Sequence, residues 1–144
     1  MKTEFITKDF LVITMIVSIW VNISEVFRYF VIVRPEMHDH LATVTNVADM
    51  NVIIFAIWGV WDTVLTGLFV FLFWLCSNVF GNNHRTVILS GLVSWCFFFL
   101  LFWVGMANMN LSNWSFLFVV LPLTLLETFV AAYIASKLYL KKNA

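Results

Sequence analysis

Four long stretches of apolar residues are separated by short clusters of polar residues. The stretches cover roughly residues 10–33, 49–76, 86–106 and 114–138. A helix of about 20 apolar residues, rising 1.5 Å per residue, crosses the roughly 30 Å of hydrocarbon in a bilayer. Each stretch is long enough to do so, and the pattern predicts four membrane-spanning helices.

The breaks between these stretches carry the signals that end helices. Arg34 and Pro35 close the first stretch, and Gly81-Asn82-Asn83 follows the second. A polar cluster at 108–115 divides the long uncharged run that follows Arg85. The predicted fold is an all-α membrane protein, a single domain over residues 1–144 with four helices in an antiparallel bundle. Helical spacing of apolar residues after Asp39 leaves open a second helix that begins there and extends beyond the membrane.

Composition fits a chain that uses lipid as its solvent. Hydrophobic residues make up 62% of the chain and charged residues 11%, whereas roughly a quarter of residues are charged in a soluble domain. The formal net charge is zero, which does not favour nucleic acid as a partner. The lipid bilayer is therefore the first partner that the sequence predicts.

The basic residues predict the orientation of the helices. Six of them lie at the chain ends or in the loop between the second and third helices, against Arg34 alone on the opposite side. The six are Lys2, Lys8, Arg85, Lys137, Lys141 and Lys142. By the positive-inside rule both termini are cytoplasmic, in a plasma membrane or bacterial inner membrane. Glu25 and Arg28 lie where a signal peptide would be cleaved, so we expect the first helix to be retained.

Four ionisable residues lie inside the predicted spans, at comparable depth: Glu25, Arg28, Asp62 and Glu127. An ionisable side chain near the bilayer centre costs about 2.5–3.5 kcal/mol on insertion scales, so it usually faces other helices and serves a function. Three carboxylates against one guanidinium leave a formal charge of −2 if all four are ionised. Because this charge is costly in a low dielectric, we expect pairing with Arg28, protonation or cation binding.

Helical periodicity adds neutral polar residues to these four. Asn22 shares a stripe with Glu25 and Arg28, Thr66 lies one turn from Asp62, and Thr128 follows Glu127. Gly59, Thr63 and Gly67 form a small-residue ladder, inside the bundle or between chains. The third helix contributes only Ser90, Gly91 and Ser94 toward one end, is otherwise apolar and is predicted to support the others. The candidate ligand- or ion-binding residues are Asn22, Glu25, Arg28, Trp58, Asp62, Thr66, Glu127 and Thr128.

Three function classes remain open. Buried carboxylates suit proton- or cation-linked transport or a channel. The same charges can instead be structural ion pairs in an accessory subunit of a membrane complex. Trp58 and Trp61 beside Asp62 would suit an intramembrane ligand-binding cavity for a small molecule. Because four helices enclose little volume, transport would require a homo-oligomer or a membrane-complex partner.

Enzyme and cofactor chemistry has little support in the sequence. The spans contain no Ser-His pair that would indicate a nucleophile and its base. No histidine lies in a span, which argues against bound haem, and we expect no cofactor. His38 and His40 form an H-x-H near Glu36 and Asp49, but two histidines are too few ligands to predict a metal site. A solvated loop is the preferred interpretation of this segment.

Overall fold

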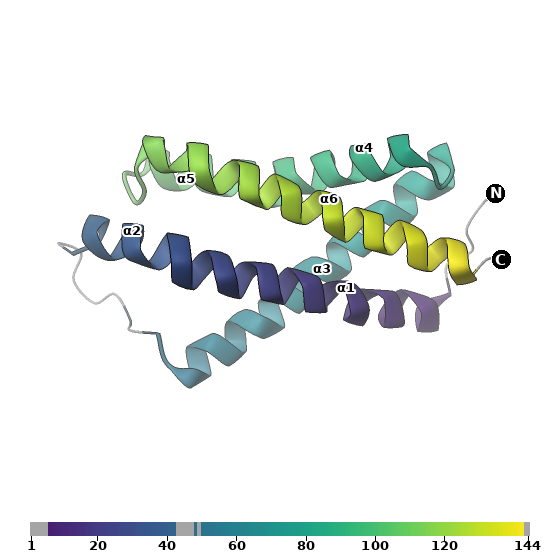
Figure 1. The fold of residues 1–144 in the computed structure, drawn as a ribbon, viewed down its shortest axis with the longest axis horizontal. Helices are drawn as coiled ribbons and strands as arrows, with labels where there is room; N and C mark the ends of the chain where they lie inside the picture. The colour runs from purple at the N-terminus through teal and green to yellow at the C-terminus, as the bar shows by residue number, and fades with distance from the viewer. Residues whose placement is uncertain (1–5, 43–47, 49, 143–144) are drawn as a thin grey trace.

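The computed structural model describes residues 6–42, 48 and 50–142, and every regular element in these ranges is a helix. Four helical rods are long and apolar enough to cross a membrane: Thr7–His40, Val52–Phe80, His84–Asn108 and Trp114–Lys141. The prediction of an all-helical chain with four such helices is confirmed. The described chain ends lie at one end of the molecule, together with the turn at Gly81–Asn83 (Figure 1). We call this the turn end, and the opposite end, with Leu41, Asn51 and Met109–Asn113, the loop end.

The first rod is longer than its apolar run. It consists of α1 (Thr7–Arg28), the π-helical segment η1 (Tyr29–Val33) and α2 (Arg34–His40). The prediction that Arg34 and Pro35 end this helix is wrong. Pro35 lies in the first turn of α2, where a missing backbone N–H is tolerated, and the wider π turn precedes it.

The second rod, α3 (Val52–Phe80), starts later and ends later than predicted. The Asn51 side chain caps it by accepting hydrogen bonds from the backbone N–H groups of Ile53 and Ile54, both at 3.0 Å. The proposed start at Asp39 is wrong, because Asp39 belongs to α2; residues 43–47 and 49 lie outside the description. The helix also continues four residues beyond Cys76.

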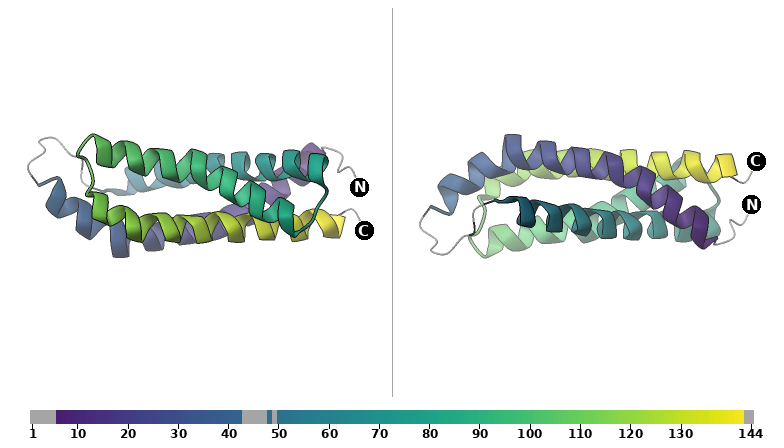
Figure 2. Two further views of the ribbon diagram at one scale, coloured as in Figure 1. Left: turned by 90° about the horizontal axis from the view of Figure 1, so that it is seen from above. Right: turned by 90° about the horizontal axis from the view of Figure 1, so that it is seen from below.

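An oblique course distinguishes α3 from the other rods. In Figure 1 it crosses behind α1, and its loop-end half diverges from α4, α5 and α6. Figure 2 shows the same rods from above and from below. The small-residue ladder of Gly59, Thr63 and Gly67 faces α1 of the same chain. A Cβ added at Gly59 would lie 3.5 Å from Asn22 Oδ1, and one at Gly67 would lie 3.7 Å from Thr14 Cγ2.

The third rod joins α4 (His84–Trp95), the π-helical η2 (Cys96–Leu100) and α5 (Leu101–Asn108). The predicted turn before it is confirmed at 81–83. Gly81 has a φ of 77°, which glycine adopts readily, and Asn83 caps α4 through the Thr86 N–H at 3.1 Å.

The fourth rod begins with the short 3₁₀ segment η3 (Trp114–Phe116) and continues as α6 (Leu117–Lys142), which carries Pro122 inside it. It packs against α1, α3 and α4. Polar contacts fasten both ends of the bundle. Asn82 and Ser136 exchange two hydrogen bonds at the turn end, and Asn113 donates to Glu36 at 2.8 Å at the loop end.

Candidate charged site

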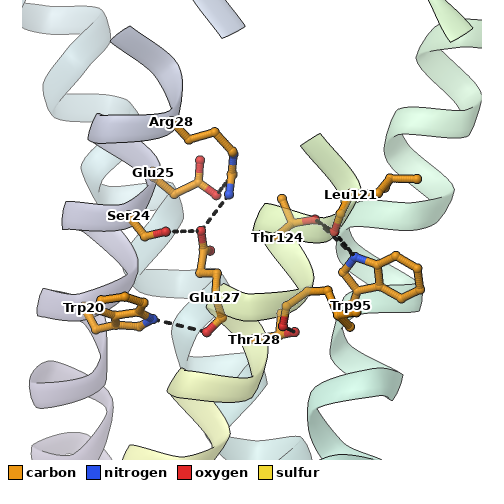
Figure 3. Close-up of polar contacts among 10 residues, drawn as sticks. Trp20, Ser24, Glu25, Arg28, Trp95, Leu121, Thr124, Glu127 and Thr128 are labelled. Atoms are coloured by element: carbon orange, nitrogen blue, oxygen red, sulfur yellow. Dashed lines mark hydrogen bonds and ion pairs between the residues drawn. The ribbon is translucent and has the colours of Figure 1, made fainter. Parts of the chain in front are cut away.

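Arg28 forms the centre of a buried ionic cluster. It is 5% exposed and ends α1, one helical turn after Glu25, so both side chains leave the same face of the helix. Its Nη2 pairs with Glu25 Oε1, and its Nη1 lies 2.6 Å from Glu127 Oε2 on α6 (Figure 3). Two carboxylates from different helices therefore share one guanidinium, through charge-assisted hydrogen bonds.

Glu127 is fully buried and is held by α1. Its Oε2 also accepts a hydrogen bond from the Ser24 hydroxyl at 2.7 Å, and its backbone carbonyl accepts one from the Trp20 indole at 3.2 Å (Figure 3). Its other carboxylate oxygen, Oε1, is buried without a hydrogen-bond partner among the described residues. One side of this carboxylate is thus firmly bound and the other is not.

An aromatic ring closes the cluster from the third rod. The Phe99 ring centre lies 5.1 Å from the Arg28 guanidinium carbon, a distance suited to a cation–π interaction. Phe99 belongs to η2, and Arg28 is the residue just before η1. Both π-helical segments therefore adjoin this cluster, as such segments often do at functional sites.

Asp62 lies beside the cluster but is not bonded into it. It is 7% exposed, and its carboxylate makes no hydrogen bond or ion pair with any described residue. Glu25 and Arg28 are the charged groups close enough to interact with it electrostatically. The helix that carries it, α3, has no other ionisable residue except Cys76.

The predicted neutral polar residues mostly serve their own helices. Asn22 donates to the Ser18 carbonyl at 2.8 Å, Thr66 to the Asp62 carbonyl at 2.7 Å and Thr128 to the Leu125 carbonyl at 3.0 Å. Their side chains donate no hydrogen bond to the buried carboxylates. Trp58 is 53% exposed and lies on the outside of α3, so it does not wall a cavity around Asp62.

Sequence reasoning missed three residues of the site: Trp20, Ser24 and Phe99. Trp20 and Ser24 precede Arg28 by two turns and one turn, and this spacing of four was available as a signal. Phe99 gave no signal, since it is one of sixteen phenylalanines in an apolar run. The third rod also contributes Trp95, whose indole donates to the Leu121 carbonyl and to Thr124 (Figure 3).

The described part of the histidine segment at the loop end does not gather metal ligands. His38 Nδ1 lies 3.2 Å from Asp39 Oδ1, and His40 Nε2 lies 2.9 Å from the Asn110 carbonyl. Among the described residues, no three His, Cys, Asp or Glu side chains are close enough to share a metal ion. Asp49, the fourth residue considered for such a site, lies outside the described residues.

Comparisons with known proteins leave the site to be interpreted from its geometry. No protein-family model, curated protein or solved structure matches this chain. The fold and the site define a small integral membrane protein with a buried ionic cluster. Three carboxylates and one guanidinium meet or adjoin there.

Proposed function

We propose that this protein is a proton-linked membrane transport protein whose charged site comprises Glu25, Arg28, Asp62 and Glu127. The observation that carries the proposal is the excess of buried carboxylates over cations. Arg28 can offset one negative charge. In the described chain, neither the Asp62 carboxylate nor the Oε1 atom of Glu127 has a hydrogen-bonding partner. An uncompensated carboxylate in a low dielectric is stable only if it binds a proton or a cation.

The geometry favours a proton over a metal ion or a larger solute. A cation that has lost its water needs several oxygen ligands around it. The side chains of Asn22, Thr66 and Thr128 bond to carbonyls of their own helices and leave few oxygen ligands for a dehydrated cation. A proton needs no such volume and moves between groups in hydrogen-bonding range.

The proposed orientation places the turn end in the cytoplasm. The described Lys8, Arg85, Lys137 and Lys141 belong to the turn end, and Arg34 lies in the first rod toward the loop end. Under the positive-inside rule this distribution supports cytoplasmic termini, an antiparallel bundle and insertion in a plasma or bacterial inner membrane.

Proton flux in proteoliposomes tests the proposal. A potassium diffusion potential drives protons inward, and an enclosed pH-sensitive dye reports them. We expect flux above that of protein-free vesicles, and its loss in Glu127→Gln and in Asp62→Asn. Asp39→Asn is the matched control, because the Asp39 side chain is 91% exposed and lies at the loop end. Equal flux in all four proteins, or none in the wild type, would contradict the proposal.

A second candidate is an accessory subunit of a membrane complex or homo-oligomer. The observation that favours it is the loop-end half of α3, where no residue from Val52 to Trp61 is buried. In that case the buried charges would act as structural ion pairs. Native membranes solubilised in a mild detergent would then yield this chain in a particle larger than one copy, and the same charge-neutral variants would release it.

A further inference from the structure

We infer that Asp62 is the carboxyl group that holds the exchangeable proton, and that it is reached from the loop end. This inference rests on the proposed proton-linked function and names the group that performs it. Glu127 and Asp62 are both buried acids, but their surroundings differ. Oε2 of Glu127 receives hydrogen bonds from Arg28 and Ser24, whereas the Asp62 carboxyl receives none from the described residues.

The difference in donors decides which acid stays ionised. Charge-assisted hydrogen bonds stabilise a carboxylate, so the pair of Glu25 and Glu127, which shares Arg28, is better suited than Asp62 to carrying negative charge. Burying an ionised carboxylate without a partner costs far more than burying the neutral acid. Asp62 is therefore the acid best suited to holding a proton at rest.

The charges around Asp62 support the same assignment. On α1, Arg28 is already bonded to two carboxylates, and Glu25 disfavours a second negative charge nearby. On α3 no other carboxyl or basic group is present, and residues 86–126 of the third and fourth rods contain no Asp, Glu, Lys, Arg or His. Glu127 is bound to Arg28 and Ser24. No cation is left over to pair with an ionised Asp62.

The course of α3 gives the side of access. From Val52 to Trp61 no residue of α3 is buried, and Asp62 is the first that is. It lies about 15 Å along the helix from Val52 at 1.5 Å per residue. Toward the turn end the helix instead buries Phe69, Val70 and Phe73. The divergent half of α3 thus leaves Asp62 closer to the loop-end surface than to the turn end.

A hydrophobic carbodiimide can identify a protonated carboxyl in apolar surroundings. The carboxyl proton moves to one nitrogen of the reagent, and the carboxyl oxygen bonds to its central carbon, giving an O-acylisourea. The acyl group then shifts from oxygen to nitrogen and forms a stable N-acylurea. No group leaves, so the modified peptide gains the whole mass of the reagent.

The experiment uses the full-length protein in detergent micelles, treated with dicyclohexylcarbodiimide and mapped by peptide mass spectrometry. We expect modification of the wild type at Asp62, its decline as the pH rises and its loss in Asp62→Asn. The Glu127→Gln protein should keep the modification. In sealed right-side-out vesicles, raising the pH on the loop-end side alone should reduce labelling, and raising it on the other side should not.

Several results would overturn the inference. These are modification mainly at Glu127 or Glu25, modification of no carboxyl in the wild type, or labelling that follows the pH on the turn-end side. Because the wild-type map decides the site, the conclusion does not depend on whether Asp62→Asn folds. The inference and the proposed function can fail separately. Labelled Asp62 without proton flux would contradict transport alone, and flux with an unlabelled Asp62 would contradict the assignment alone.

Discussion

At the scale of single residues, Arg28 is one cation that two carboxylates share. It pairs with Glu25 and Glu127 together, although it can offset only one of their charges, and it lies against the Phe99 ring. Removing one member of a buried ion pair usually costs more than the pair itself contributes, because the other charge stays buried alone. Arg28 is the single cation of its cluster, and its loss should affect both glutamates.

We therefore predict that Arg28→Met is strongly destabilising, by about 3–5 kcal/mol, which is the range for an orphaned buried charge. Glu127→Gln should cost clearly less, because Arg28 keeps its pair with Glu25. Unfolding in mixed micelles with increasing denaturing detergent, followed by tryptophan fluorescence, measures both. Equal stability of Arg28→Met and wild type would show that the cluster contributes nothing to folding.

The double variant Arg28→Met with Glu127→Leu is the accompanying control. It removes the ion pair between α1 and α6 and leaves an apolar contact in its place. Replacing a buried ion pair by apolar residues is often neutral or stabilising. The double variant should therefore recover part of the loss seen in Arg28→Met. A double variant less stable than both single variants would mean that packing, and not charge, dominates at this position.

Residue-level prediction from the sequence identified ionisable residues on polar helix faces but could not show which of them are in contact. Glu25, Arg28 and Glu127 were expected at one depth on polar faces, and the structure brings these three together. Its helical spacing to Asp62 also suggested Trp58, which is 53% exposed. In a membrane, both the lipid-facing and the inward-facing sides of a helix are apolar. The hydrophobic pattern therefore could not tell an exposed tryptophan from a buried one.

At the scale of helices, α4 and α6 approach each other closely at Gly91. A methyl group at this position would overlap the Phe129 ring and lie 3.4 Å from the Phe129 Cα. The glycine lets the two helices meet at close range, as small residues do between membrane helices. Ser90 and Ser94 beside it are also buried.

Gly91→Ala should destabilise the protein by about 1–3 kcal/mol, the usual cost of overpacking a tight contact. Gly105→Ala is the matched control in the same rod, because nothing lies within 4 Å of a Cβ added there. Alanine is favoured over glycine in a helix by roughly 0.5–1 kcal/mol, so the control should be neutral or slightly stabilising. The unfolding assay used for Arg28→Met measures both, and similar values for the two variants would rule out a tight crossing at Gly91.

Helix existence could be predicted from the sequence, whereas helix ends and helix interruptions could not. The four apolar runs and the turn at 81–83 are strong local signals, and the structure contains both. Pro35 was interpreted as a stop, but a proline in a first helical turn is compatible with continuation. The π-helical segments η1 and η2 could not be predicted from the apolar pattern. A π turn contains one extra residue, and in these segments the residues that shift position are all apolar or aromatic.

At the scale of the whole molecule, α6 is the most enclosed of the four rods. In the most apolar window of each rod, 39% of residues are buried in α6, against 28% in each of the other three. The sequence indicated three helices with polar faces and a more apolar third helix. It did not indicate which of the four would be the most enclosed. Hydrophobic contrast normally marks the inner face of a helix, and lipid removes that contrast. The oblique course of α3 is invisible for the same reason.

The orientation of the molecule is the last property that the charge pattern predicts. Met109 and His84 are exposed residues at the loop end and the turn end. In a background with Cys76 and Cys96 replaced by alanine, Met109→Cys should react with a membrane-impermeant maleimide on intact bacterial host cells. His84→Cys should react only after the cells are made permeable, because the positive-inside rule predicts that the turn end, with its lysines and Arg85, is cytoplasmic. The reverse labelling pattern would show that the protein has the opposite orientation. The proposed route to Asp62 would then open on the cytoplasmic side. Labelling of both positions on intact cells would show that charge does not fix one orientation.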